Sequence, residues 1–180
     1  YHQYIPCVEF DRDGNLLPFA ITSDQWGQFL CELFDEWIQK DAYHVSVRLF
    51  DALINFMVNG SYSVCHLAGN CCQYFVVEHN GDIYPCDFFV EEEKKLGNLF
   101  DTSWEEMQAG SKYHAFGGQK TEWDVKCSKC EYLAYCSGDC LKHRVYSGNG
   151  PDNISWLCEG WKAFYRHALP RLKELAESVL

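Results

Sequence analysis

Cysteine is concentrated in one part of this chain. Nine of the eleven cysteines fall between residues 65 and 158, and the densest stretch, CSKCEYLAYCSGDC at 127–140, has the spacing C-x2-C-x5-C-x3-C. Spacings this short let one turn of backbone direct several thiolates at one metal centre. The sequence therefore predicts that metal binding organises this part of the chain. The nine residues are Cys65, Cys71, Cys72, Cys86, Cys127, Cys130, Cys136, Cys140 and Cys158.

The composition is that of a folded protein, with 180 residues of which 47% are hydrophobic and 16% aromatic. A chain of this length can bury one good core, or two small ones supported by something besides apolar contacts. No apolar run is long enough to cross a bilayer, and no signal peptide opens the chain. The sequence starts YHQYIPCVEF, without a methionine and within a strand-like pattern, so we expect a fragment of a longer protein.

Charge and cysteine count argue against two further classes of protein. The net charge of −11 argues against a nucleic-acid partner, because no basic patch exists to neutralise phosphates. A disulfide-rich secreted domain is disfavoured by the odd number of cysteines, the missing signal peptide and a length that does not require bridges. We therefore expect a cytoplasmic protein with metal-bound thiolates. Cys7 and Cys31, outside the dense region, are expected to be buried structural thiols.

Residues 1–60 alternate between strand and helix patterns. The segments 3–10 and 45–50 are predicted strands. Thr22–Asp24 offers N-caps for a helix of about four turns with apolar residues every three or four positions. A second helix is expected over Asp51–Val58, with Asp51 as its cap. This order predicts the end of an α/β barrel or a layered sheet.

A change in composition at Ser61 marks the predicted domain boundary. Beyond it, two strand patterns flank Asn80-Gly81, which is the strongest local signal for a β-hairpin. With these two residues central, Phe75 is expected opposite Cys86, which brings Cys86 back toward the Cys71-Cys72 end.

The remaining elements are a short helix, a loop and a long helix. Ser103–Glu106 is a capping box that opens the short helix, which is expected to end near Gly110. The stretch 113–125 has no clear period and is predicted as a loop, and 147–151 as a turn-rich link. A helix is predicted over 159–180, with a kink or break before Pro170.

Two metals compete for the cysteines. A tetrahedral zinc site could use Cys127, Cys130 and Cys136 with Cys140 or His143, but the other cysteines would then need a second zinc. Iron–sulfur clusters use four thiolates each and often divide a short run between two clusters, so eight spaced cysteines suit two [4Fe–4S] clusters. Spacing favours iron–sulfur only modestly, and it does not determine which four cysteines share a cluster.

The residues resemble a known family. The spacing C-x5-C-x14-C from Cys65, followed by the run at 127–140 and a distant Cys158, is similar to the SPASM domain of radical S-adenosylmethionine enzymes. The stretch YFVVEHNGDIYPCDFFV resembles the anaerobic sulfatase-maturating enzymes, which convert an active-site Cys or Ser of a sulfatase to Cα-formylglycine. Residues 1–60 also resemble the closing strands and helices of that family's partial barrel, so the resemblance covers essentially the whole chain.

The resemblance implies a fold and three parts. The expected class is α/β to α+β: the end of a partial (β/α) barrel over 1–60, a small cysteine-rich SPASM domain with a hairpin and cluster-binding loops over 61–158, and a C-terminal helix over 159–180.

The resemblance also implies two auxiliary [4Fe–4S] clusters. The first cysteine set is Cys65, Cys71, Cys86 and Cys140. The second cysteine set is Cys127, Cys130, Cys136 and Cys158. Full cysteine ligation leaves no open iron, which favours electron transfer over direct binding of substrate. Cys72 is left over and is expected to be structural.

Asp87 is the remaining position carried over from the family. The aspartate at this position removes the proton from the substrate thiol or hydroxyl, and a carboxylate one residue from a cluster ligand couples the loss of a proton and of an electron in one place. The simpler alternative is that Asp87 only hydrogen-bonds the end of the hairpin.

One motif of the family has no counterpart here. The catalytic cluster uses C-x3-C-x2-C, which this sequence lacks, so the stretch alone is expected to be inactive and to belong to a longer enzyme with S-adenosylmethionine and a third [4Fe–4S] cluster. A sulfatase polypeptide and a reducing donor such as flavodoxin or ferredoxin are the implied partners, with neither nucleic acid nor membrane. The alternatives are a separate electron-transfer or docking module, another SPASM peptide maturase such as a thioether-forming one, and a non-redox zinc-binding module.

Overall fold

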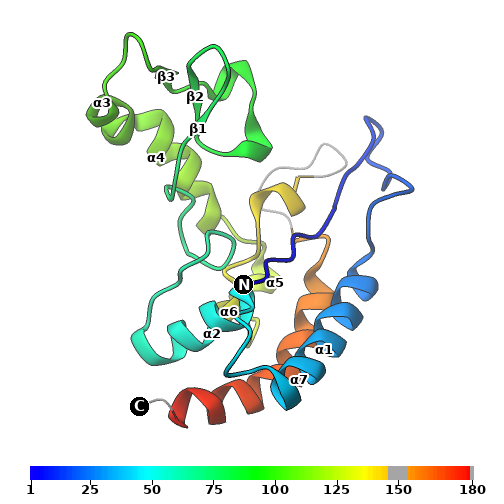
Figure 1. The fold of residues 1–180 in the computed structure, drawn as a ribbon. Coiled ribbons are helices and arrows are strands. Elements are labelled where there is room, and N and C mark those ends of the chain that lie inside the picture. The colour runs from blue at the N-terminus through cyan, green and yellow to red at the C-terminus, as the bar shows by residue number, and fades with distance from the viewer. Residues whose placement is uncertain (146–153, 179–180) are drawn as a thin grey trace.

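Two long helices, one near the N-terminus and one near the C-terminus of the chain, pack side by side at one end of the molecule (Figure 1). The computed structural model describes residues 1–145 and 154–178. Within this part the helices are α1 (Ser23–Lys40), α2 (Arg48–Asn59), α3 (Trp104–Ala109), α4 (Ser111–Gly118), α5 (Val125–Ser128), α6 (Leu133–Cys136) and α7 (Cys158–Ser178). Short 3₁₀ turns cover Asp87–Phe89, Glu92–Lys94, Gln119–Thr121 and Leu141–His143.

α1 begins where its cap was predicted. Thr22 accepts a hydrogen bond from the backbone N–H of Gln25, and the Gln25 side chain accepts one from Thr22 in return, which completes a capping box. α2 begins earlier than expected, with Val47 as its N-cap, and Asp51 lies in its first turn instead. Gly60, in the left-handed conformation, ends α2 as glycine commonly does.

The strands expected at 3–10 and 45–50 do not form: only isolated bridges are present, and residues 48–50 belong to α2. His2 pairs with Val47 in parallel, and Phe10 pairs with Leu16 across a turn. A parallel strand needs partners far away in sequence, and the described residues offer this segment a single parallel bridge. The exposed thiol of Cys7 follows from this arrangement and contradicts the expected burial, whereas Cys31 is half-buried.

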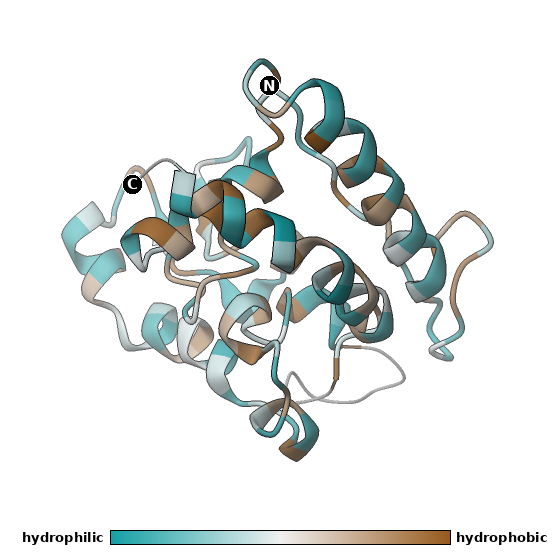
Figure 2. Ribbon diagram, turned by 90° about the horizontal axis from the view of Figure 1, so that it is seen from below, coloured by the Kyte–Doolittle hydropathy of each residue, from teal (hydrophilic) through white to brown (hydrophobic). Residues whose placement is uncertain are grey.

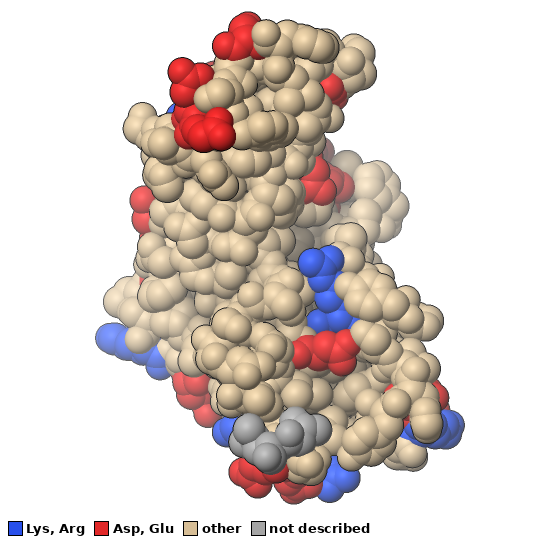
Figure 3. All heavy atoms as spheres, turned by 60° about the vertical axis from the view of Figure 1, so that its left-hand side comes forward, with Lys and Arg blue, Asp and Glu red and all other residues tan. Residues whose placement is uncertain are grey.

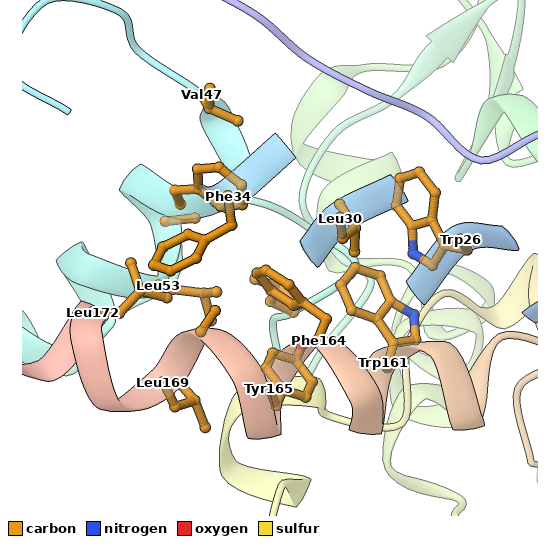
Figure 4. Packing of buried hydrophobic residues seen from close by; sticks show 14 of the residues in the cluster. Trp26, Leu30, Phe34, Val47, Leu53, Trp161, Phe164, Tyr165, Leu169 and Leu172 are labelled. Atoms are coloured by element: carbon orange, nitrogen blue, oxygen red, sulfur yellow. The ribbon is translucent and has the colours of Figure 1, made fainter. Parts of the chain in front are cut away.

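The principal core lies between α1, α2 and α7. Hydrophobic residues recur along the helices between hydrophilic ones (Figure 2), as expected for elements with one buried side. Figure 4 shows Trp26, Leu30 and Phe34 of α1 facing Trp161 and Phe164 of α7. Each such side chain contributes about 1.5–3 kcal/mol when fully buried.

α1 and α7 approach closely at two glycines. A Cβ on Gly27 would lie 2.8 Å from the Cα of Gly160, and a Cβ on Gly160 would overlap the carbonyl oxygen of Ser23. The Ser23 hydroxyl also accepts a hydrogen bond of 2.8 Å from the backbone N–H of Gly160. This contact fixes the start of α7, whose first residue is Cys158. Of the kink or break expected before Pro170, the break is absent, because α7 continues through Pro170 to Ser178; residues 179–180 lie outside the described residues.

The predicted hairpin is present, with a different register. β1 (Val76–Val77) pairs with β2 (Asp82–Tyr84), and β3 (Gly97–Asn98) adds a third antiparallel strand that was not predicted. Val76 lies opposite Tyr84, so the expected pairing of Phe75 with Cys86 is wrong by one residue. The cause is a three-residue connection in which Gly81 has a φ of +86°, instead of a two-residue Asn-Gly turn.

The segment after the sheet is more helical than predicted. Ser103 and Glu106 form the expected capping box, and α3 ends at Gly110. The predicted loop at 113–125 is instead α4 followed by the 3₁₀ turn Gln119–Thr121. The link predicted at 147–151 lies outside the described residues.

The length of the helices and the charge of the surface are relevant to whether the protein binds membranes or nucleic acid. None of the described helices has the length and apolar character needed to cross a bilayer. On the face drawn in Figure 3, acidic side chains gather at the upper end, and the visible lysines and arginines are scattered. No broad basic surface is therefore visible among the described residues on that face.

The contact of α1 with α7 generates a first prediction. Gly160→Ala places a methyl group against the backbone at Ser23 and should destabilise the fold by about 1–3 kcal/mol, the usual cost of overpacking. Chemical unfolding monitored by circular dichroism measures this. Gly118→Ala is the matched control, because nothing lies within 4 Å of its Cβ and its φ of −65° suits alanine. Equal stability of both variants and the wild type would contradict the close approach.

Candidate functional site

The first cysteine set surrounds one cavity. Cys65, Cys71, Cys86 and Cys140 all line a space of about 30 Å³. Cys65 and Cys71 come from the loop after α2, Cys86 from the end of the hairpin and Cys140 from the turn after α6. The rest of the lining is largely apolar and includes Phe89, Phe116 and Leu141, which form a small core of their own.

The second cysteine set surrounds another cavity, of about 130 Å³. Cys127 belongs to α5, Cys130 follows it, Cys136 ends α6 and Cys158 begins α7. The lining also includes Tyr132, Trp161 and Tyr165, of which Trp161 and Tyr165 belong to the principal core and Tyr132 packs against it. The eight cysteines thus lie four and four around two separate spaces.

The three residues between Cys136 and Cys140 separate the two spaces. Ser137, Gly138 and Asp139 have φ values of 45°, 70° and 62°, a run of left-handed residues that costs energy at the two non-glycine positions. Cys136 consequently faces one cavity and Cys140 the other. We call residues 137–139 the dividing turn.

Two buried cations hold the dividing turn. Arg144, 1% exposed, donates to the carbonyl oxygens of Gly138 at 2.6 Å, Ser137 at 2.8 Å and Asp139 at 3.1 Å. Lys120, fully buried, donates to the carbonyl oxygens of Asp139 and His66. A Cβ on Gly138 would overlap the guanidinium of Arg144. These bonds stabilise a backbone conformation that the sequence alone disfavours.

Burial favours the protonated form of several of these thiols when no metal is bound. It raises the pKa of Cys86 and of Cys158 to about 11, and the pKa values of Cys136 and Cys140 also rise, with burial as the main cause. Metal ligation requires thiolates, so a bound metal must supply the positive charge that offsets this burial.

Four cysteines around one cavity are the donor set of a four-iron cluster. Among the described residues, no three side chains of His, Cys, Asp or Glu converge closely enough to hold one metal ion. Zinc would require its thiolates at about 2.3 Å from one centre. In a four-iron cluster each of four cysteines binds a different iron, and each of the two cavities has four cysteines in its lining. The donor sets therefore fit the iron–sulfur groups that the sequence predicts.

A third cavity, of about 150 Å³, lies next to the first cysteine set. It is lined by Asp87 and by residues from both ends of the chain, and it shares Cys65, His66, Tyr74 and Cys140 with the first cavity. Phe88 also lines both cavities, and the remaining lining includes Tyr4, Ile5, Trp26, Arg48 and Trp161.

Asp87 lies at the junction of these two cavities. Its Oδ1 accepts hydrogen bonds from the hydroxyl of Tyr74 at 2.9 Å and from the thiol of Cys86 at 3.4 Å. The hydroxyl of Tyr74 is also 3.7 Å from the Cys86 sulfur. Burial raises the pKa of Tyr74, so it stays a donor. Asp87 Oδ2 has no hydrogen-bond partner among the described residues, since both bonds go to Oδ1.

A buried polar group near Asp87 was not found from the sequence. Asp139 Oδ2 accepts a hydrogen bond of 2.6 Å from Ser155 and lies 2.8 Å from His143 Nδ1. Burial opposes its ionisation, but His143 and the hydrogen bonds hold the pKa of Asp139 well below its usual range. Burial lowers the pKa of His66 to about 4, so this ring is neutral. Neither Asp139 nor Lys120 was marked by any pattern in the sequence.

The remaining cysteine of the dense region has a packing role. The Cys72 thiol donates to the carbonyl oxygen of Tyr113 at 3.3 Å, and a Cβ on Gly117 would overlap its sulfur. Cys72 lines none of the three cavities described above. Cys72 therefore packs the loop after α2 against α4.

Part of the cysteine region matches the model of a known domain family. Residues 65–131 match the model of the SPASM iron-sulfur cluster-binding domain. This range ends before Cys136, Cys140 and Cys158.

Curated relatives match nearly the whole chain. A serine-type anaerobic sulfatase-maturating enzyme of Bacteroides thetaiotaomicron is 32% identical over 94% of this chain and 41% of its own length. A cysteine-type enzyme of Clostridium perfringens is 30% identical over 98% of this chain and 49% of its own length. The chain therefore spans about half the length of the curated relatives it matches.

A solved structure agrees with these relatives. The structure described as native anSMEcpe with bound AdoMet and the Cp18Cys peptide has a TM-score of 0.89 and 31% identity, covering 99% of this chain and 50% of that one. Mixed helix and sheet, a small cysteine-rich domain and a C-terminal helix are thus confirmed as the fold class.

The dividing turn generates the second prediction. Gly138→Ala combines an unfavourable φ with a clash against Arg144, and it should lower the stability of the protein by about 1–3 kcal/mol. Thermal unfolding under anaerobic conditions measures the change. Gly69→Ala is the control, because its Cβ would meet nothing within 4 Å. A Gly138→Ala protein as stable as this control would show that Arg144 does not constrain the turn.

Proposed function

We propose that this chain is the auxiliary-cluster part of an anaerobic sulfatase-maturating enzyme. Nearly the whole chain is similar to such enzymes, and the match covers about half of the length of each one. In this proposal it forms the C-terminal half of a cytoplasmic radical S-adenosylmethionine oxidoreductase. The whole enzyme oxidises an active-site Cys or Ser of a sulfatase to Cα-formylglycine. Its further partners are S-adenosylmethionine, a third [4Fe–4S] cluster and a reducing protein such as flavodoxin or ferredoxin.

One observation carries the proposal for the cofactors. The eight cysteines lie around two cavities in the same two groups of four that the family's pattern implies, although spacing left the grouping open. We assign one [4Fe–4S] cluster to Cys65, Cys71, Cys86 and Cys140, and another to Cys127, Cys130, Cys136 and Cys158. When bound, such clusters accept and pass on single electrons.

The protein's own residues define the place of proton removal. Asp87 is the proposed base, with Oδ2 accepting the proton of the substrate thiol or hydroxyl. The hydroxyl of Tyr74 holds the other carboxylate oxygen, so the orientation of Asp87 is fixed. The third cavity borders this carboxylate and is mostly apolar, which limits water around the group that loses its proton.

The grouping of cysteines generates the third prediction. The 180-residue protein purified anaerobically should contain about eight irons and eight sulfides, as two four-iron clusters require. Cys140→Ala and Cys136→Ala should each remove about half of the iron, but from different clusters, because these residues lie on different cavities. Iron and sulfide analysis with electron paramagnetic resonance measures both effects.

Cys72→Ala is the control for these variants and should keep both clusters, since Cys72 lines neither cavity. A wild-type protein with zinc and no sulfide would sink the iron–sulfur assignment. Loss of the same spectroscopic signal in Cys136→Ala and Cys140→Ala would contradict the grouping alone.

The role of Asp87 generates the fourth prediction. In the whole enzyme, Asp87→Asn should reduce formylglycine formation by at least about 100-fold, since a positioned base typically contributes 10²–10⁴-fold, while iron content stays unchanged. Mass spectrometry of a sulfatase-derived peptide measures the product.

Glu91→Gln is the matched control, because Glu91 lies four residues away and pairs with Lys94 at the surface. It should leave turnover unchanged. Retained turnover in Asp87→Asn would instead favour the simpler reading, in which Asp87 only hydrogen-bonds the end of the hairpin.

A further inference from the structure

Lys120 is a buried cation that the proposed chemistry does not use. Its side chain is fully buried, although it lies in the short 3₁₀ turn Gln119–Thr121 after α4. A lysine ammonium has three N–H donors, and removing it from water is costly unless charge or hydrogen bonds compensate.

The hydrogen bonds of Lys120 go to neutral groups. Its Nζ donates to the carbonyl oxygen of His66 at 2.8 Å and to that of Asp139. Among the described residues, no carboxylate lies within ion-pair distance of Lys120. Oδ2 of the Asp139 carboxylate contacts His143 and Ser155, and its buried Oδ1 has no hydrogen-bond partner among the described residues. Carbonyl dipoles therefore solvate the ammonium without neutralising it.

The two carbonyl groups place this charge beside the first cysteine set. His66 follows Cys65, and Asp139 precedes Cys140. Lys120 does not line the cavity itself, so it lies behind the backbone that carries these two cysteines.

Electrostatic interactions agree with this placement. Burial and the neighbouring Arg144 lower the pKa of Lys120, and the charges of Asp139, Cys71 and Cys140 oppose the shift. Two members of the first cysteine set are therefore close enough to act on the ammonium. Lys120 also acts on Cys136 of the second set, where its charge favours the thiolate.

We propose that Lys120 is the buried counter-charge of the iron–sulfur cluster assigned to the first cysteine set, and that it raises the reduction potential of this cluster. The inference rests on the proposed function, because it presumes that clusters are bound. It assigns a role to a residue that is no ligand and touches no substrate.

The physical reason is the charge that an added electron brings. Four thiolates give a bound cluster net negative charge, and reduction by one electron makes it more negative. A fixed positive charge nearby stabilises the reduced form, and net charge is among the factors that set cluster potentials. Because Lys120 is removed from water, solvent and salt screen its charge much less than that of a surface lysine.

The test compares reduction potentials in three variants. Lys120→Met keeps the length of the side chain and removes its charge, Lys120→Arg keeps the charge, and Lys112→Met removes an exposed lysine of α4. Redox titration of the anaerobically purified protein, monitored by electron paramagnetic resonance, gives the potential of each cluster. Iron and sulfide analysis shows that the clusters are present.

In Lys120→Met the equilibrium constant for reduction of the first cluster should fall about tenfold. This lowers its reduction potential by about 59 mV for one electron. The shift of the second cluster should be smaller, and Lys120→Arg and Lys112→Met should stay close to the wild type. Loaded Lys120→Met protein with wild-type potentials overturns the inference and leaves the cluster assignment intact. Wild-type protein without iron and sulfide overturns both.

A second variant provides the test if the Lys120→Met protein does not retain its clusters. Asp139→Asn removes the buried anion that acts on Lys120, with little change in shape. Its first cluster should become easier to reduce, the opposite sign to Lys120→Met. An unchanged or lower potential in loaded Asp139→Asn protein would overturn the role of buried charge.

Discussion

The site depends on the left-handed turn between Cys136 and Cys140. Residues four apart on a helix share a face, so an α-helical C-x3-C segment would direct both thiols to the same side. Here α6 ends at Cys136, and three residues with positive φ reverse the chain before Cys140. The two thiols consequently serve different cavities. The turn is unfavourable by itself, and the hydrogen bonds from Arg144 and Lys120 to its carbonyl groups are what hold it.

The large apolar core positions the site from the other side. Cys158 is the first residue of α7, and α7 is held against α1 by the aromatic cluster and by the contact of Gly160 with Gly27 and Ser23. Tyr165 of the same helix belongs to the core and also lines the second cavity. The start of the chain therefore influences the geometry of cysteines more than a hundred residues away. Bound clusters would in turn stabilise this packing, since ligand binding to the folded state adds to its stability.

Local signals in the sequence predicted local structure well. The caps at Thr22 and Ser103 and the hairpin around Gly81 follow from short-range hydrogen bonds, and all three are present. The register failed by one residue because Gly81 occupies a three-residue connection, which Asn-Gly does not distinguish from a two-residue turn. α4 was missed because SKYHAFGG has no apolar period and two glycines, while the surrounding structure buries Tyr113 and Phe116. The strand at 3–10 failed because its pairing depends on distant segments.

The candidate site shows the same division between local and distant information. Ligand spacing and the resemblance named the eight cysteines and Asp87, but nothing in the sequence marks Lys120, because its burial arises only when the carbonyl groups of His66 and Asp139 meet around it.

In the proposed function, a proton and an electron are both transferred at one short segment, Cys86-Asp87. Cys86 faces the first cavity, Asp87 faces the third, and the Cys86 thiol and the Tyr74 hydroxyl share one carboxylate oxygen. A proton arriving on Asp87 removes a negative charge one residue from a proposed cluster ligand. An electron arriving at that cluster adds one at the same place. Because the two changes oppose each other electrostatically, each makes the other more favourable, and the buried charge of Lys120 acts in the same direction as the proton. In the proposed function, such a site would favour the loss of both a proton and an electron from a substrate bound beside Asp87.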